Sequence, residues 1–186
     1  MRLNAEVKYT EGGMRTALKG MQVQSALVDI TNDNVTGFDK VGYQRKEAVM
    51  SSFVEYLGPD GISTTVDDKV GRLVNTANPL DLAVATKGYF QIKTAEGVKL
   101  TRDGRFKLDK DGNLLTLDDS KVLADSGAPI KLGIIPDNLK EVVVNSRGSL
   151  SVLNKETKKL EKVATIGVVD SNGVIMPNPE VKQGYN

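Results

Sequence analysis

The sequence contains no histidine and no cysteine. Without histidine there is no imidazole to act as a base near neutral pH, and without cysteine there is no thiolate nucleophile. Nearly all zinc and iron sites depend on these two residue types, so they are excluded as well. Tryptophan is also absent and aromatic residues make up only 5% of the chain, which disfavours a carbohydrate site built on aromatic platforms. Only carboxylates, Lys, Tyr, Ser and Thr remain for chemistry, and our expectation is that the chain has no enzyme activity, no metal and no cofactor.

The sequence also lacks an excess of charge and a long apolar run. Lys and Arg total 25 against 24 Asp and Glu, a formal net charge of +1 at pH 7. That balance gives no field to concentrate a polyanion, so we expect no nucleic-acid partner. No stretch approaches the length of a membrane span, and the N-terminus has no apolar secretory signal, so we expect no membrane insertion. The hydrophobic content of 39% and the length of 186 residues suit one domain with an appendage, or two small domains.

The N-terminal part predicts a helix. Residues 1–13 are polar and end in two glycines, so we expect them to be an extension, with Met14 as a possible native start. From there apolar residues recur at three- and four-residue steps, which predicts a helix over residues 14–34. The apolar stripe of this helix consists of Met14, Leu18, Met21 and Val28. Packing of the stripe on its own domain is the alternative to a role in an interface.

A connecting region follows the helix. Gly37 can close the helix in a left-handed conformation. Residues 46–57 have apolar positions that fit a strand as well as a helical turn or two. The turn signal at residues 58–61 marks the expected boundary, so we predict a helical and extended assembly segment at 14–57 and a β-rich domain at 58–186.

The second region is rich in short β runs separated by Gly, Asp and Asn, which predicts an antiparallel β domain, a sandwich or barrel, after the N-terminal helix. We expect hairpins at Lys87-Gly88, Asp103-Gly104 and Asp111-Gly112, with positive φ at Gly88 and Gly104. Further strands are expected near residues 121–124, 141–145, 148–153, 163–169 and 173–176. The charged residues 155–162 are expected to form a solvated hairpin loop.

Two patterns could carry chemistry. Residues 109–113, Asp-Lys-Asp-Gly-Asn, resemble a calcium loop, but the Gly is fourth rather than sixth, so we interpret them as a turn. A pair of carboxylates from Asp67, Asp68, Asp118 or Asp119 could assemble in space for glycoside hydrolysis. The sequence alone does not exclude a carbohydrate-active enzyme of this kind.

Two ordered blocks carry a resemblance to a known family. The first is Asn78-Pro-Leu-Asp-Leu-Ala-Val84 followed by Gly88-Tyr-Phe-Gln-Ile92, and the second runs from Leu100-Thr-Arg-Asp-Gly-Arg-Phe106 to Asp111-Gly-Asn-Leu-Leu-Thr116. Together with the N-terminal helix and Gly42-Tyr43-Gln44-Arg45, they are similar to bacterial flagellar basal-body rod and hook proteins. The resemblance covers residues 14–132 well and residues 133–186 more loosely.

The resemblance implies a tubular axial polymer in which helices line the inner tube and β domains form the outer layer. It implies copies of the chain and other flagellar axial proteins as partners, passage through the flagellar type III export apparatus, and an exported, extracytoplasmic location in the flagellar basal body. The family continues past Gln183-Gly184-Tyr185 into a second helix, so we expect either a truncation or a helical layer completed by neighbouring subunits. The residues expected at the assembly interface are Met14, Leu18, Met21, Val28, Asn34, Gly42 and Tyr43.

One alternative of another class is a secreted or surface β-domain binding module, in which the helix would be only a linker. Concentration-dependent oligomer formation separates the two interpretations.

Overall fold

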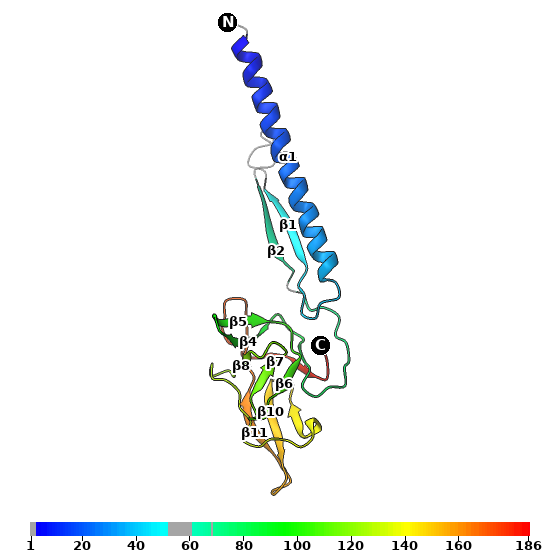
Figure 1. Ribbon diagram of the computed structural model, residues 1–186, viewed down its shortest axis with the longest axis vertical. Coiled ribbons are helices and arrows are strands. Elements are labelled where there is room, and N and C mark those ends of the chain that lie inside the picture. The colour runs from blue at the N-terminus through cyan, green and yellow to red at the C-terminus, as the bar shows by residue number, and fades with distance from the viewer. Residues whose placement is uncertain (1–2, 52–60, 68) are drawn as a thin grey trace. The chain divides into compact units, whose positions relative to one another are not determined.

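The computed structural model describes residues 3–51, 61–67 and 69–186, and the side chains of residues 12–49, 63–67 and 69–186 within them. The chain forms two units. Unit 1 contains residues 1–40 and 44–68, and unit 2 contains residues 41–43 and 69–186. Figure 1 shows both units and labels α1 and several of the strands.

Unit 1 is built on one helix, α1, which spans Leu3–Gly37. The predicted helix is therefore confirmed over 14–34, but the prediction of a separate polar extension at 1–13 is wrong from Leu3 onward. Gly12 and Gly13 each cost a helix about 1 kcal/mol relative to Ala, which weakens it without ending it when good helix formers lie on both sides. Gly37 is the last helical residue and does not adopt positive φ, contrary to expectation.

A two-stranded hairpin lies beside α1 (Figure 1). Strand β1 (Lys46–Ser51) pairs antiparallel with β2 (Gly61–Val66), in a register from Lys46↔Val66 to Ser51↔Gly61. Residues 46–51 therefore form a strand, which is one of the two structures that the sequence allowed for residues 46–57. Residues 52–57 and the predicted turn residues 58–60 lie outside the described residues.

Unit 2 is an antiparallel β domain, as the sequence predicts. Its strands are β3 (Leu82–Val84), β4 (Tyr89–Thr94), β5 (Gly97–Thr101), β6 (Phe106–Leu108), β7 (Leu114–Thr116), β8 (Lys121–Val122), β9 (Val142–Val144), β10 (Ser149–Asn154), β11 (Lys159–Thr165), β12 (Val168–Val169) and β13 (Val181–Gln183), with a 3-10 turn η1 at Leu139–Glu141. The largest sheet has the order β12-β4-β8-β7-β6, with β5 also paired to β4. A second sheet has the order β11-β10-β9, and β13 pairs with β3.

Some predicted hairpins are confirmed and others are wrong. The hairpin at Asp111-Gly112 joins β6 to β7. Of the charged residues 155–162, residues 155–158 form the loop between β10 and β11, whereas residues 159–162 belong to β11, so the predicted loop is confirmed only in its first half. No hairpin forms at Lys87-Gly88, because β3 pairs with the distant β13 rather than with β4. None forms at Asp103-Gly104 either, since β5 pairs with β4 while β6 pairs with β7. At 173–176 the expected strand is reduced to a single bridge, Val169↔Ile175.

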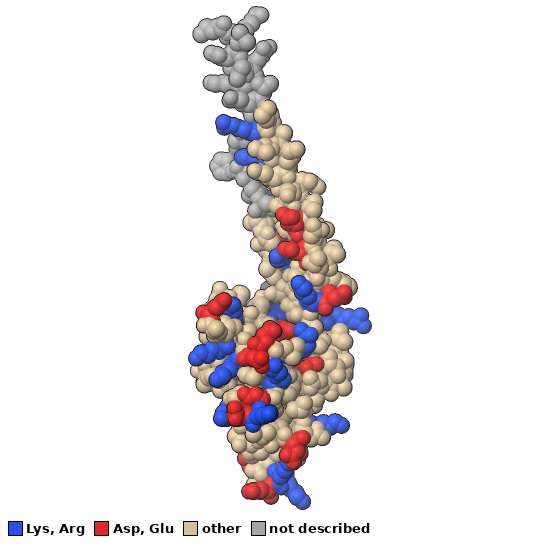
Figure 2. Space-filling view, in the orientation of Figure 1, with Lys and Arg blue, Asp and Glu red and all other residues tan. Residues whose placement is uncertain are grey.

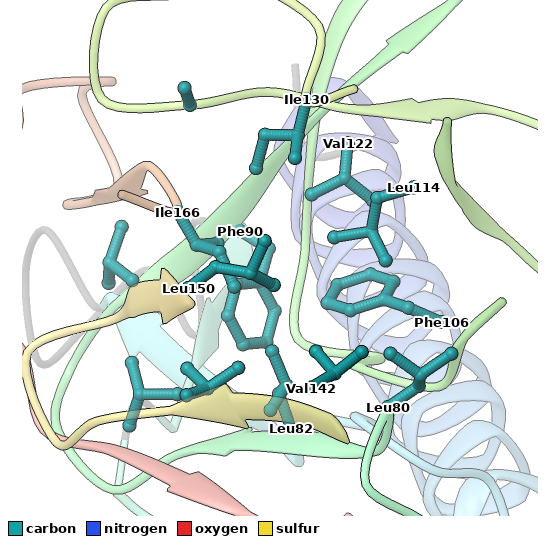
Figure 3. Close-up of a cluster of buried hydrophobic side chains, with 14 of the residues drawn as sticks. Leu80, Leu82, Phe90, Phe106, Leu114, Val122, Ile130, Val142, Leu150 and Ile166 are labelled. Carbon is teal, nitrogen blue, oxygen red and sulfur yellow. The ribbon is translucent and has the colours of Figure 1, made fainter. Parts of the chain in front are cut away.

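The core of unit 2 lies between these sheets and consists of aliphatic side chains around two phenylalanines. The rings of Phe90 and Phe106 meet edge to face, with centroids 5.2 Å apart and planes at 78° (Figure 3). The side chain of Phe90 is fully buried. Leu82, Leu114 and Leu150 pack in the same cluster, each nearly inaccessible to solvent. One continuous core therefore stabilises the domain.

Gly88 and Gly104 both lie where neighbouring segments pack closely, but only Gly104 excludes a side chain outright. Neither has positive φ, so the expectation for both is wrong on that point. A Cβ atom at Gly104 would lie 1.7 Å from the backbone carbonyl oxygen of Leu82, which cannot rotate away. A Cβ atom at Gly88 would lie 2.7 Å from Sδ of Met176, the end of a flexible side chain that can move.

The two ends of unit 2 meet. The backbones of Val74 and Asn186 exchange two hydrogen bonds, of 2.9 and 3.0 Å, and Thr76 donates to the carbonyl of Gly184 at 2.9 Å. The side chain of Gln183 connects this region to β9: its Oε1 accepts from Val144 N at 3.0 Å, and its Nε2 donates to two backbone carbonyls. The first and last segments of the domain thus form one antiparallel edge.

Candidate assembly surface

The predicted stripe on α1 is exposed. The exposed fractions are 74% for Met14, 56% for Leu18, 70% for Met21 and 49% for Val28. The structure adds Val35, which follows Val28 by seven residues and is 69% exposed. The same helical spacing in the sequence would have found Val35. Together these five residues form what we term the apolar stripe.

The opposite face of α1 packs against the β1–β2 hairpin. Val23, Ala26, Leu27 and Ile30 are all half-buried. Val23 and Ile30 follow Met21 and Val28 by two residues, which is about half a turn of a helix with ~3.6 residues per turn. The helix therefore has two apolar faces, and its own hairpin covers the one opposite the stripe. This is the arrangement expected of a helix that contacts something besides its own hairpin.

Asn34 holds the end of α1 to β1. Its Oδ1 accepts from Lys46 N at 2.8 Å, and its Nδ2 donates to Lys46 O at 2.9 Å. The Lys46 ammonium also lies 2.6 Å from the Asp33 carboxylate, in an exposed ion pair. One amide thus satisfies both backbone groups at the start of β1. The structure gives Asn34 this internal role, and its place in an interface stays a prediction.

Gly42 and Tyr43 lie apart from the stripe, in the segment between α1 and β1. Gly42 has φ +73°, and its backbone packs closely against the backbone of Arg102 and Asp103. Tyr43 is half-buried next to it. The structure therefore brings together four of the seven predicted interface residues and places the other three in contacts within the chain.

The second block of the resemblance forms a tightly bonded loop in unit 2. Arg105 donates to Asp103 from its backbone at 3.1 Å and from its guanidinium at 2.9 and 2.6 Å. Burial raises the pKa of the Asp103 carboxyl, but the hydrogen bonds from Arg105 and its positive charge outweigh burial, so the pKa falls below its ordinary value of 3.8. The same hydrogen bonds raise the pKa of Arg105. The pair fixes the loop between β5 and β6.

The sequence resembling a calcium loop is a turn, as predicted. Oδ1 of Asp109 accepts from the backbone N–H groups of Asp111 and Asn113, and Oδ2 accepts from the Asn113 amide at 2.6 Å. The side-chain hydrogen bond from Asn113 is the main cause that lowers the pKa of Asp109. Gly112 has φ +80° and donates to the Asp109 carbonyl. The carboxylate is therefore committed to the turn.

The carboxylates considered for hydrolysis belong to different units of the chain. Asp67 belongs to unit 1, whereas Asp118 and Asp119 belong to unit 2, where Asp119 pairs with Lys107 at 2.7 Å. Asp68 lies outside the described residues. An open groove of about 420 Å³ in unit 2 has one carboxylate, Asp125, among its described lining residues.

Charges of both signs are interspersed over the visible face of unit 2 (Figure 2). Among the residues that the structure describes, no three acidic side chains are grouped so as to hold a metal ion. Within the same residues, no helix is both long and apolar enough to cross a membrane.

Comparison with known proteins gives a consistent result. The flagellar hook protein FlgE/F/G D1 domain matches residues 83–152, which include both blocks of the resemblance from Ala83 onward. The flagellar basal-body rod protein FlgF of Mesorhizobium japonicum is 30% identical over 128 residues, covering 66% of this chain and 53% of the relative. The flagellar basal-body rod protein FlgG of Bacillus subtilis is 25% identical over 182 residues, covering 86% and 68%. The flagellar hook protein FlgE of Rhizobium meliloti is 28% identical over 176 residues, covering 90% and 41%.

The matches to FlgG and FlgE cover 86% and 90% of the chain and so include parts of both units, and the relatives are rod and hook proteins alike. The chain spans about half the length of the FlgF relative and two thirds of the FlgG relative. The alternative of an unrelated surface binding module is not favoured by them. In its paired blocks, its antiparallel β domain and these matches, the chain is similar to bacterial flagellar rod and hook proteins.

Proposed function

We propose that this chain is a structural subunit of the bacterial flagellar rod or hook that acts by self-assembly into a tubular axial polymer. The observation that carries the proposal is the apolar stripe of α1. It is exposed on the side of the helix opposite its own hairpin, in a chain similar to these rod and hook proteins. Partners that cover this stripe would be other copies of the chain or other axial proteins.

The area that the stripe offers decides what kind of contact it can make. Full burial of one Leu, Met or Val side chain contributes about 1.5–3 kcal/mol, so covering the exposed parts of the five stripe residues contributes roughly 5–10 kcal/mol per subunit. Association of two proteins costs an estimated ~4–15 kcal/mol of rigid-body freedom, which is of the same size as this gain. A single helix pairing is therefore marginal, and contacts of each subunit with several neighbours, as in a polymer, would stabilise the assembly further.

The location follows from the same proposal. We place the chain in the flagellar basal body or hook, outside the cytoplasm, after passage through the flagellar type III export apparatus. The support is indirect: the relatives are rod and hook proteins by name, and they match to similar extents. A choice between rod and hook is not part of the proposal.

The test places charges in the stripe. In the double variant Leu18→Asp/Met21→Asp, two carboxylates must lose their hydration when the stripe is covered, and unpaired buried charge is strongly unfavourable. We expect assembly, measured by sedimentation over a range of concentrations, to be lost while the thermal melt of the β domain is unchanged. The matched control is Gln22→Asp/Gln24→Asp, which adds the same charge at exposed positions on either side of the stripe and should still assemble.

Two outcomes would contradict the proposal. If the stripe packs within its own subunit, the double variant lowers the melting temperature of the monomer and leaves association intact. If the wild-type chain stays monomeric at all concentrations with purified axial partners present, the surface binding module becomes the better interpretation.

A further inference from the structure

The chain passes between unit 1 and unit 2 at residues 41–43 and again at Lys69, and both of these segments contact the loop Thr101–Arg105 of unit 2. Residues 41–43, between α1 and β1, belong to unit 2 by their contacts, and the chain then returns to unit 1 for the hairpin. It re-enters unit 2 at Lys69. Both entry points are held by one loop, through contacts that all lie within unit 2.

Gly42 is the first contact. A Cβ atom at this position would lie 2.7 Å from the backbone N of Asp103 and 2.8 Å from the carbonyl carbon of Arg102. Backbone atoms cannot rotate away as the end of a side chain can, so residues 41–43 could keep this position only with glycine. The φ of +73° favours glycine independently, because any other residue is strained there.

Arg102 is the second contact. Its guanidinium donates to the carbonyl oxygens of Gly88 at 3.2 Å, Lys69 at 3.4 Å and Thr86 at 3.5 Å. It also lies over the ring of Tyr89, 5.2 Å from the centroid. The planar fork of arginine reaches several acceptors and a ring face at once, which a lysine cannot do. Arg102 thus joins the first residue of the second segment to the turn before β4.

We infer that the Thr101–Arg105 loop is an anchor that fixes both connecting segments to the β domain, with Gly42 and Arg102 as its positioning residues. This assigns a role to the second block of the resemblance and to Gly42, which the sequence placed at an intersubunit interface. The inference concerns the single chain and does not require the polymer.

Limited trypsin digestion of the full-length monomer tests the anchor. Lys40 and Lys69 are exposed and flank the two anchored segments, while Lys131 is exposed on another loop of unit 2 and reports general opening of that domain. In Gly42→Ala and Arg102→Gln we expect cleavage after Lys40 and Lys69 to rise about fivefold relative to cleavage after Lys131. The reason is that each variant loses local stability worth about one or two hydrogen bonds, so the anchored segments open more often.

The controls separate the anchor from strain and from loss of charge. Gly127 has φ +78° with no atom within 4 Å of a Cβ, so Gly127→Ala carries the same backbone strain without the contact. Arg147→Gln removes an exposed arginine elsewhere in unit 2. Both controls should digest like the wild type at these sites. An unchanged ratio in both anchor variants, or an equal rise in the controls, overturns the inference. If Gly42→Ala does not fold, Arg102→Gln decides alone. Because the digest uses monomer, failure of assembly would leave this result unaffected.

Discussion

Gly104 offers the sharpest test of the packing in unit 2. In Gly104→Ala the new methyl group would lie 1.7 Å from the carbonyl oxygen of Leu82, so the two segments must separate by about 1.3 Å to reach a 3.0 Å contact. They cannot separate freely, because the N–H of Leu82 donates to the carbonyl of Gly104 at 2.9 Å, and that of Phe106 donates to Leu80 at 3.2 Å. The ring of Phe90 blocks the remaining direction, with Cε2 2.9 Å from the methyl position.

The expected cost combines two effects. Overpacking a well-packed core costs about 1–3 kcal/mol. Losing one or two backbone hydrogen bonds adds about 1 kcal/mol each. We therefore expect Gly104→Ala to lower the free energy of unfolding by roughly 2–5 kcal/mol, measured by urea denaturation followed by circular dichroism.

Gly133→Ala is the matched control, because nothing lies within 4 Å of its Cβ and its φ is not positive. This change should be neutral or slightly stabilising, since alanine restricts the unfolded chain. If the free energy of unfolding of Gly104→Ala is within about 0.5 kcal/mol of the wild-type value, the close approach of Leu82 and Gly104 is wrong.

Two further predictions concern polar groups. Gln183→Ala should lower the free energy of unfolding by about 2–3 kcal/mol, because the N–H of Val144 and two carbonyls lose their partner; Lys182→Ala, which removes an exposed side chain, should change it little in the same denaturation experiment. The pKa of Asp103 is lower in the folded than in the unfolded chain, so its pair with Arg105 stabilises the domain fully above about pH 5, where the unfolded carboxyl is ionised. This contribution is lost as the pH falls through the folded pKa, which lies below 3.8. Asp103→Asn should therefore flatten the fall in melting temperature between pH 5 and about pH 2.5, and an unchanged slope would contradict the assignment.

Local patterns in the sequence predicted the features that depend on local physics. The spacing of Met14, Leu18, Met21 and Val28 predicted both a helix and its exposed face. The Asp111-Gly112 turn predicted the hairpin between β6 and β7, because the turn residues themselves set that conformation. The helix start was missed because the two glycines suggested a break, whereas continuous helix formers on both sides carry α1 through them.

Contacts between distant residues could not be predicted from the same patterns. All three residues of β3 are buried, so a turn signal after them does not select β4 over β13 as a partner. The sequence predicts a turn with positive φ at Gly104 and marks Arg102 only as part of the block shared with the family. Their roles depend on the carbonyl of Leu82 and on the carbonyls of Thr86 and Gly88, whose positions are set by the tertiary fold.

The antiparallel edge formed by residues 74–76 and 184–186 makes unit 2 an insertable module. Because the segments at its two ends are already hydrogen-bonded neighbours, the loops and strands between them can lengthen, shorten or be exchanged without changing the spacing of the chain on either side. A reporter peptide fused after Asn186 would emerge beside Val74, and a different domain with equally close ends could replace residues 77–183 in an engineered chain. If residues 74 and 186 were pulled apart, the hydrogen bonds of this edge would break one after another. The edge would therefore separate before the applied force disturbed the core.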